Sequence, residues 1–279
     1  MIIEEAIPVI NLLADEKLKD ALIQSFTESA NSVEKIELCF SSLPEKRWAD
    51  ETLATFFHCW KASHLKMLAI YGLSCRLQRL ALSSEGNKRE QLFISAARNA
   101  ATSYEDLGLD YDGETHADLY DRFASAFLKN SFWQIESYGL PQALEFKQWI
   151  YRNMVVSDIT TGLLTNIFSE IYNHSEYSLA LKAFSQLVDD HYSFSPEEKS
   201  RALLYISVHV EDETEVDHFL VVAEALNHYR DAIECEIDYD QAKSLFKEYL
   251  SRLGSVMESL ARMMQAQDGA QVISSQHRA

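Results

Sequence analysis

Residues 203–222 read LLYISVHVEDETEVDHFLVV, and their apolar positions recur at the spacing of an α-helix. Because each residue advances by about 100°, Glu211, Glu215 and His218 fall within about 60° of one another on the apolar face of the predicted helix. An unpaired buried carboxylate costs several kcal/mol, so such a group needs a compensating charge. A bound cation provides it, since carboxylates and imidazoles are ligands that Fe, Mn and Zn accept. This stretch therefore predicts a helix with a metal site on its buried face.

The same acidic run has a second interpretation. Residues 211–217 then form a solvated helix face with His218 at its edge, which is the more common fate of a run of charges. The apolar residues one turn to either side favour the buried interpretation instead. His209 lies on the opposite side of the predicted helix, away from the acidic group.

The composition of the whole chain agrees with a helical fold. Its 279 residues include 8 Gly and 4 Pro, a combined share of about 4% against roughly 12% in an average protein. Sheet proteins need these residues at frequent turns. We therefore predict an all-α protein, and its 47% of hydrophobic residues suffice for one large core.

The charge balance limits the partners that the surface can bind. The chain has 25 basic and 43 acidic residues, which gives a net charge of −18. Such a surface repels phosphate backbones and anionic lipids, so we expect no binding to nucleic acid or to membranes. The nearest approach to a membrane span, residues 154–168, contains Asp158 and is shorter than the roughly 18 apolar residues required.

The start of the chain and its cysteines indicate a compartment. Glu4 and Glu5 stand where a secretory signal needs positive charge. The cysteines form no C-x-x-C pair, which is typical of reduced thiols. There are four of them, Cys39, Cys59, Cys75 and Cys235. We therefore expect a cytoplasmic protein.

Turn residues divide the chain into predicted helices. These cover residues 14–30, 49–83, 88–106, 114–129, 141–173, 176–191, 196 to beyond 225, and 239–266. The segment 141–173 is either one helix or two, and Ser175 is expected to cap the next helix. Ser195 before Pro196 is a good helix start. We expect a single domain over residues 1–265 and a disordered tail over 266–279.

Another histidine lies on an apolar helix face. His116 begins the predicted helix 114–129, and the residues that share its face are apolar. A single histidine in such a place is more often a packed core residue. The acidic group described above makes a shared site more plausible, because carboxylates and histidines that converge inside a bundle are how di-iron and di-manganese sites are built.

Three motifs follow one another along the chain. Residues 56–60 read FFHCW, residues 105–108 read EDLG and are followed by HADLY at 116–120, and Glu211-x3-Glu215-x2-His218 comes last. This order resembles the haem-oxygenase-like di-iron oxidases, relatives of thiaminase II and of pyrroloquinoline quinone synthase, over roughly residues 47–226. The resemblance implies a haem-oxygenase-like bundle of about seven to nine helices.

The motifs depart from the family pattern at several positions. Family members carry a Glu on the first long helix, a Glu two residues before a Gly, a later Glu, and a final His-x3-Asp-x2-His. Here Glu211 and Glu215 replace the first His and the Asp, and Asp106 replaces the Glu before Gly108. No acid lies within FFHCW, so the substitutes for the first Glu are His58 and His64. The candidates for the later Glu are Glu145, Glu170 and Glu176.

A shifted frame of the last motif is also conceivable. It makes His209 the first ligand, followed by Glu213, but it places Val216 at the terminal His. The unshifted frame keeps His218.

The resemblance implies a function for these residues. Two iron ions, or one that is stably bound, would lie among the helices and use O₂ to oxidise a small organic substrate, and the chain would form a homodimer. The implied metal ligands are His116, Glu211, Glu215 and His218, with Glu170 or Glu176, and more weakly Asp106. Because these ligands bind metal as neutral imidazoles and ionised carboxylates, acid should release it.

Two other classes of function remain open. One is a cofactorless enzyme of the same fold that acts on an aromatic or heterocyclic molecule, which the missing acid on the first long helix favours. Hydrolysis of the thiaminase type needs a positioned cysteine nucleophile, and none of the four cysteines has a matching neighbourhood. The other class is a non-catalytic interaction module, in which the acids at 211–217 dock a basic partner.

Overall fold

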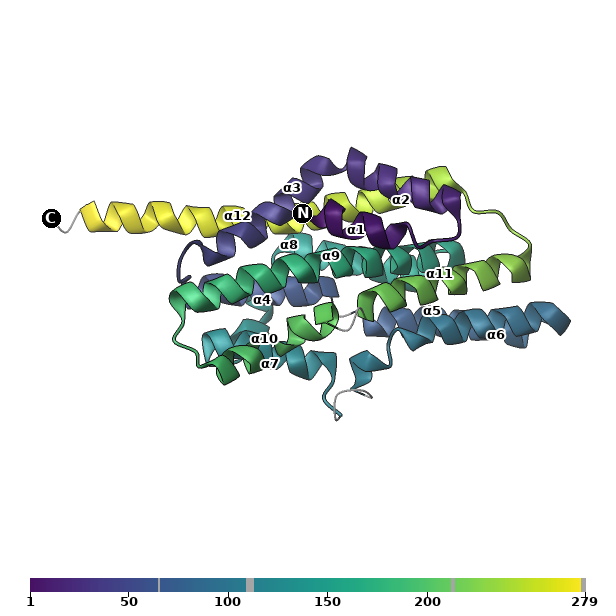
Figure 1. Cartoon of the computed structure of the whole chain (residues 1–279), viewed down its shortest axis with the longest axis horizontal. Helices are drawn as coiled ribbons and strands as arrows, with labels where there is room; N and C mark the ends of the chain where they lie inside the picture. The colour runs from purple at the N-terminus through teal and green to yellow at the C-terminus, as the bar shows by residue number, and fades with distance from the viewer. Residues whose placement is uncertain (65, 109–112, 212–213, 277–279) are drawn as a thin grey trace.

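A computed structural model describes residues 1–64, 66–108, 113–211 and 214–276 of the chain (Figure 1). At Glu105, Glu211, Thr214 and residues 267–276 it describes the backbone alone. Over these ranges the regular elements are all helical, which confirms the all-α prediction. The α-helices are Ile2–Ile10 (α1), Glu16–Glu28 (α2), Ala30–Ser42 (α3), Asp50–His64 (α4), Met67–Leu82 (α5), Gly86–Ala101 (α6), His116–Leu128 (α7), Pro141–Tyr151 (α8), Ile159–His191 (α9), Pro196–Glu211 (α10), Thr214–Ile233 (α11) and Tyr239–Gln276 (α12).

The described chain has more helices than the seven to nine expected. The predicted helix 49–83 is divided in two, the predicted helix from 196 to beyond 225 is described as α10 and α11 on either side of residues 212–213, and α1 and α3 were not predicted. The final helix α12 continues to Gln276, through most of the segment that we expected to be a disordered tail.

The central element is α9, which runs through the middle of the molecule (Figure 1). Asp158 caps it by accepting a hydrogen bond from the Thr161 backbone N–H at 2.8 Å. Between residues 161 and 177 almost every side chain is buried, on all sides of the helix. Such burial is typical of a helix that other elements surround, and α9 contacts α1, α5, α10, α11 and α12.

The prediction that Ser175 caps a new helix was wrong. The structure places Ser175 in the interior of α9, where its hydroxyl donates to the Ile171 carbonyl at 3.4 Å. Serine can bond the preceding turn of a helix as well as cap a new one, so the residue alone does not mark a boundary.

The segment 141–173 is two helices joined by a π-helical turn, Arg152–Val156. The Arg76 side chain of α5 donates to the carbonyls of Met154 and Ser157, which fixes the end of this turn. At Gly162 a Cβ atom would lie 2.8 Å from a methyl group of Leu73. The glycine therefore allows α5 and α9 to pack closely beside the turn.

The predicted helix 49–83 is interrupted, because α4 ends at His64 and α5 begins at Met67. The Ser63 hydroxyl and the His64 ring both bond the Trp60 carbonyl, at 2.7 and 2.8 Å. Such side-chain bonds compete with the helical backbone pattern and favour a helix end. Lys66 lies at this break, directly before α5.

The predicted helix that runs from 196 past 225 is described in two parts. The first, α10, runs to Glu211, and the second, α11, begins at Thr214. Residues 212–213 and the Glu211 side chain lie outside the described part of the chain, so the predicted common face of Glu211, Glu215 and His218 remains a prediction.

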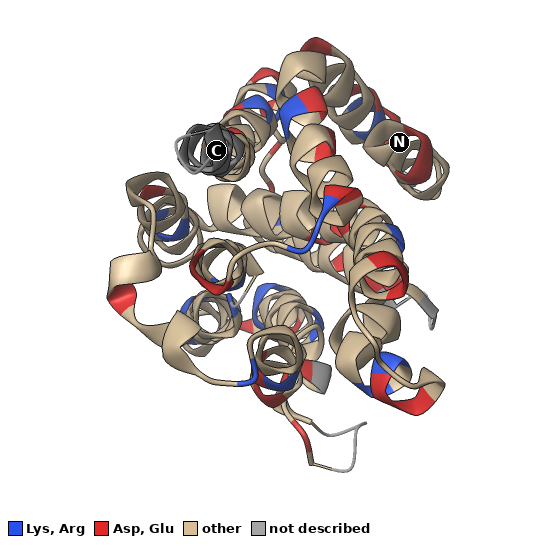
Figure 2. Ribbon diagram, turned by 90° about the vertical axis from the view of Figure 1, so that its left-hand side faces the viewer, with Lys and Arg blue, Asp and Glu red and all other residues tan. Residues whose placement is uncertain are grey.

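The charged residues are spread around the molecule. Asp and Glu lie on helices all around the bundle in end view, with Lys and Arg between them (Figure 2). No described helix combines the length and the apolar character that crossing a bilayer requires.

Candidate metal centre

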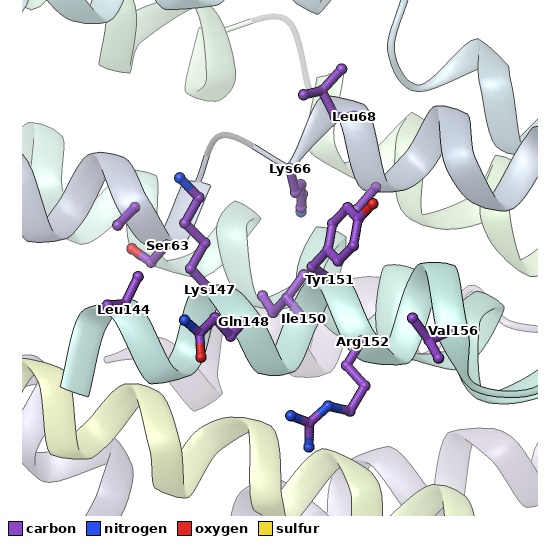
Figure 3. Close-up of a pocket in the computed structure, with 12 residues that line it drawn as sticks. Ser63, Lys66, Leu68, Leu144, Lys147, Gln148, Ile150, Tyr151, Arg152 and Val156 are labelled. Atoms are coloured by element: carbon purple, nitrogen blue, oxygen red, sulfur yellow. The ribbon is translucent and has the colours of Figure 1, made fainter. Parts of the chain in front are cut away.

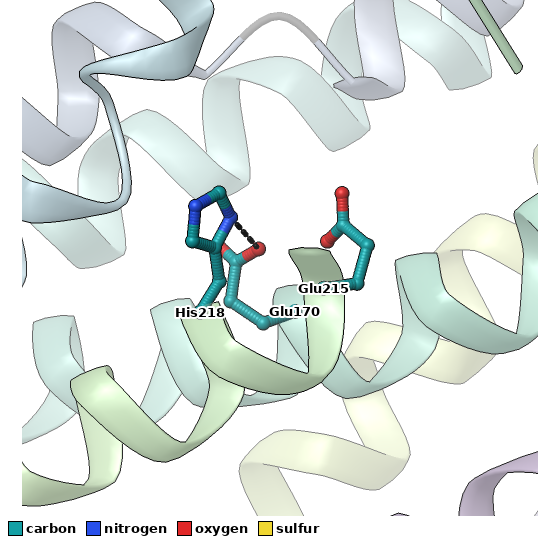
Figure 4. Close-up of side chains that lie close together, drawn as sticks. All are labelled: Glu170, Glu215 and His218. Atoms are coloured by element: carbon teal, nitrogen blue, oxygen red, sulfur yellow. Dashed lines mark ion pairs between the residues drawn. The ribbon is translucent and has the colours of Figure 1, made fainter. Parts of the chain in front are cut away.

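Three of the predicted ligands lie together inside the bundle (Figure 4). Glu170 comes from α9, and Glu215 and His218 come from the first turns of α11. One ligand atom from each residue lies within 4.8 Å of the other two. His218 Nδ1 lies 3.9 Å from Glu170 Oε2.

His209 also reaches this group, although the sequence placed it on the opposite side. Its Nδ1 lies 2.8 Å from Glu215 Oε1. The direction of approach does not make a hydrogen bond, and neither ring nitrogen has such a partner among the described residues. The ring of Tyr177 is stacked on the His209 ring, with centroids 4.0 Å apart. The sequence separated His209 from Glu215 by assuming one regular helix, whereas the structure brings the two side chains together from α10 and α11.

The two ionisable groups of this contact have shifted pKa values. Burial lowers the pKa of His209 well below its usual value, and the neighbouring His116 and His64 lower it further. Burial raises the pKa of Glu215 well above its usual value, and the Glu170 carboxyl beside it raises it further. His209 is therefore a neutral imidazole, which is the form that binds metals.

Lys66 supplies a positive charge to the group, and the sequence did not identify it. Its Nζ lies 3.3 Å from Glu170 Oε1, and it also contacts the Ser169 hydroxyl. Both side chains of the Lys66–Glu170 ion pair are almost completely buried. The only available signal was the position of Lys66 two residues after His64, at the end of an aromatic-rich helix.

His116 lies next to this group and is held by Asp106. Its Nδ1 is 2.7 Å from Asp106 Oδ1, and its ring centroid is 4.6 Å from that of His209. A capping box between Thr115 and Asp118 starts α7 and fixes the direction of His116 in its first turn. A carboxylate on one ring nitrogen of a histidine is the usual way to orient the other nitrogen toward a ligand.

Glu176 belongs to a separate cluster one and a half turns further along α9. Its Oε2 is 2.5 Å from His64 Nε2, and its Oε1 accepts a hydrogen bond from the Tyr172 hydroxyl at 2.6 Å. Both carboxylate oxygens are therefore used within the protein. The structure thus places Glu176 apart from the group of three.

Two further candidates, Glu145 and His58, lie apart from the group, and the side chains of two others are not described. Glu145 is exposed on α8, and His58 bonds the Trp133 carbonyl at 3.0 Å. The Glu211 side chain and the whole of Glu213 lie outside the described part of the chain.

A small cavity of about 20 Å³ lies among these side chains. Its walls include residues from the break between α4 and α5 and from α7, α9, α10 and α11, among them Lys66, His116, Glu170, His209, Glu215 and His218. Such a volume holds an ion or a water molecule.

A much larger pocket of about 650 Å³ lies beside this cavity (Figure 3). It lies between the α4–α5 break on one side and α8 with its π-helical turn on the other. Lys66 lines both the pocket and the small cavity, so it stands between them. The pocket has the volume of a typical small-molecule site.

The cysteines do not contribute to either space. All four are free thiols, and none lines the small cavity or the pocket. Cys59 is buried, and burial raises its pKa to about 11. This cysteine is therefore a thiol at neutral pH and not an activated nucleophile.

Comparison with known proteins supports the fold. No family model matches the sequence, and no curated protein matches it. Among solved structures the chain is similar to a TenA homolog from Pseudomonas syringae pv. tomato, with a TM-score of 0.60 and 9% sequence identity. The aligned region covers 89% of this chain and 93% of that chain. At this identity the likeness shows a shared all-α fold, which agrees with the fold part of the resemblance seen in the sequence.

Proposed function

We propose that this chain is a non-haem iron oxidase or oxygenase that uses O₂ to oxidise a small organic molecule. The observation that carries the proposal is the buried group of Glu170, Glu215 and His218, with His209 in contact. Two buried carboxyl groups that face each other can both ionise only beside positive charge, which iron would add to that of Lys66, and the carboxylate and imidazole donors of this group are suited to iron.

The distances within the group fit metal ligands. Ligands about 2.1 Å from an ion lie about 3 Å apart on neighbouring octahedral positions and about 4.2 Å apart on opposite ones. The 2.8 Å between His209 and Glu215 matches the first value. The 4.8 Å spread of the group of three slightly exceeds the second, so side-chain movements below about 1 Å would close it around an ion.

The atoms without partners also fit a bound cation. Among the described residues, Glu215 Oε2 and both ring nitrogens of His209 have no hydrogen-bond partner. Buried polar atoms are almost always satisfied, so three such atoms around one small cavity favour a missing ligand.

Each residue then has a defined role. Glu170, Glu215 and His218 would hold iron, and His209 and His116, which lie beside Glu215, would hold a second ion where two are bound. Asp106 orients His116 through the 2.7 Å contact. The iron, when bound, supplies electrons to O₂ and the oxidising power for the substrate. Glu215 gives up its proton on metal binding, and the stacked ring of Tyr177 shields His209 from water.

Iron binding tests the proposal with a matched pair of variants. Chelator-treated protein is loaded anaerobically with Fe(II), desalted and analysed for iron. We expect one to two equivalents in the wild type, a loss of most of the iron in Glu170→Gln, and retention in Glu176→Gln. Both residues are buried on α9, so the pair separates a ligand from a structural carboxylate. Less than half an equivalent in the wild type would contradict the proposal.

A double variant tests the ligand assignment and the interaction-module alternative. His116→Ala with His218→Ala removes one histidine from each half of the proposed centre. We expect iron to be lost while the circular dichroism spectrum stays helical. Unchanged iron content would reject the assignment.

Lys66 favours one second candidate, a cofactorless enzyme of the same fold. Its ammonium already lies 3.3 Å from Glu170 and neutralises part of the acidic charge without a metal. In that case the pair of Glu215 and His209 would transfer protons to or from a bound organic molecule. An enzyme of this kind would turn over its substrate with the chelator present and without O₂, which the iron oxidase would not.

A further inference from the structure

The large pocket has an apolar wall that is open to solvent. Leu68, Leu144, Tyr151 and Val156 line it, and each of these side chains is more than half exposed. Tyr151 and Lys147 extend from α8 toward the α4–α5 break, whereas the Arg152 guanidinium points to the other side of the helix (Figure 3). Exposed apolar side chains gathered around one concave space mark a binding site.

The charge of this pocket is opposite to that of the protein. None of its twelve lining residues is acidic, and three are basic, Lys66, Lys147 and Arg152. Because the Arg152 guanidinium points away, the positive charge at the pocket comes from the two lysines. The chain as a whole has 43 acidic and 25 basic residues. A ligand with negative charge would therefore be repelled by most of the surface and attracted here.

Two of these basic residues differ in their partners. Lys147 is exposed and has no ion-pair partner in the described part of the chain, so its charge is available to a ligand. Lys66 is buried at the inner end of the pocket, where its ammonium forms an ion pair with Glu170. The pocket thus offers one cation near its mouth and another next to the candidate metal centre.

We propose that this pocket binds an amphipathic organic anion, with its apolar body against Leu144 and Tyr151 and its anionic head drawn to Lys66 and Lys147. Its identity as the substrate rests on the proposed function, but the binding itself does not require metal. The volume of about 650 Å³ is suited to a small molecule. A small anion can reach the buried Lys66, which the flat surface of another protein cannot.

Matched ligands test the charge selectivity in chelator-treated protein. The probes are 5-phenylpentanoate, 5-phenylpentane-1-sulfonate, 5-phenylpentan-1-ol and 5-phenylpentylammonium, which share one apolar body. Calorimetric titration should show both anions binding about tenfold more tightly than the alcohol, as expected for one charge-assisted hydrogen bond. Equal binding of all four probes, or preference for the ammonium, would overturn the proposal.

Variants at exposed positions locate the site without endangering the fold. Leu144→Glu places an acid on the apolar wall and should weaken binding of 5-phenylpentanoate about fivefold or more relative to Leu144→Gln. Lys147→Gln should also weaken it, whereas Lys88→Gln on the distant helix α6 should not. Equal effects of the two lysine variants would show a general charge effect and contradict the site. A dimer whose formation occludes the pocket from all probes would do the same.

The metal separates this proposal from the proposed function. Fe(II) and the Lys66 ammonium compete for Glu170, so bound Fe(II) should free Lys66 for the anion. Fe(II) should then tighten binding of 5-phenylpentanoate about fivefold. The Lys66→Met variant should abolish this effect. If Fe(II) does not bind while the anion selectivity remains, the proposed function fails and the pocket assignment stands. If Fe(II) binds but anions show no preference, the pocket assignment fails alone.

Discussion

Two buried glutamates on α9, Glu176 and Glu170, have opposite surroundings. Glu176 uses both oxygens within the protein, on His64 and on Tyr172. Glu170 shares its charge with Lys66 and faces a second carboxyl, Glu215, which keeps one oxygen without a hydrogen-bond partner among the described residues. Residue type, helix and burial are the same, so none of these distinguishes a structural carboxylate from a ligand. The partners do, because Glu176 is held by a histidine and a tyrosine, whereas Glu170 lies beside a lysine and a second carboxyl group.

Removal of the saturated carboxylate should have the largest effect on stability. Glu176→Ala leaves His64 and Tyr172 without their buried partner and should lower the free energy of unfolding by about 3–5 kcal/mol. Urea unfolding of chelator-treated protein measures this loss, and Glu145→Gln on the exposed face of α8 serves as the control, with a change below about 0.5 kcal/mol. A loss below about 1 kcal/mol would show that the Glu176 cluster is not what stabilises the core.

Glu215, the carboxyl group beside Glu170, should instead make the stability of the metal-free protein depend on pH. An unfolded Glu loses its proton above about pH 4.5, while the raised pKa of Glu215 keeps the folded group protonated. Its contribution to stability therefore falls as pH rises above this value. The Glu215→Gln variant lacks this fall in stability. Its free energy of unfolding relative to that of the wild type should therefore increase between pH 5 and 8, by up to about 1.4 kcal/mol per pH unit.

Urea unfolding at several pH values, with chelator present, checks this difference. The low pKa of His209 has the opposite effect, because it lowers stability as pH falls below about 6.5. The histidine is common to both proteins, so its effect should largely cancel in the comparison. A difference that stays constant with pH would mean that Glu215 is ionised in the folded protein.

A smaller change tests a single hydrogen bond within the Glu176 cluster. Tyr172→Phe removes a single hydrogen bond to Glu176 and should lower the free energy of unfolding by about 1 kcal/mol, without changing iron binding. The exposed Tyr104→Phe is the matched control and should have no measurable effect. Loss of iron in Tyr172→Phe would show that the two clusters act as one site.

The fold class was predictable because it depends on composition and local periodicity. The shortage of Gly and Pro favoured helices, and the predicted cap at Ser195 correctly marked the start of α10 at Pro196. The grouping of Glu170, Glu215 and His218 was among the predicted possibilities, since each candidate lay on an apolar helix face. Periodicity could not choose between Glu170 and Glu176, because both lie on a helix that is buried on all sides.

His209 and Lys66 were missed for a related physical reason. Periodicity gives the direction of a side chain only along an unbroken helix. Lys66 lies at the break between α4 and α5, and His209 and Glu215 belong to two separately described helices, α10 and α11. The interruption at His64 depends on side-chain bonds to the Trp60 carbonyl, which a propensity for helix does not reveal. The functional candidates thus cluster where the regular pattern of the sequence stops.

The burial of α9 on all sides has a kinetic consequence. A helix without a solvent-facing side exchanges its amide hydrogens only when the whole bundle opens, so the backbone under Glu170 should be among the slowest to exchange. The other walls of the small cavity include the end of α4 and the first turns of α7 and α11. An ion held here would have one ligand on the fully buried helix α9 and its other ligands on helix ends that can open locally. Its residence time would then be set by the helix ends and not by the global stability of the protein.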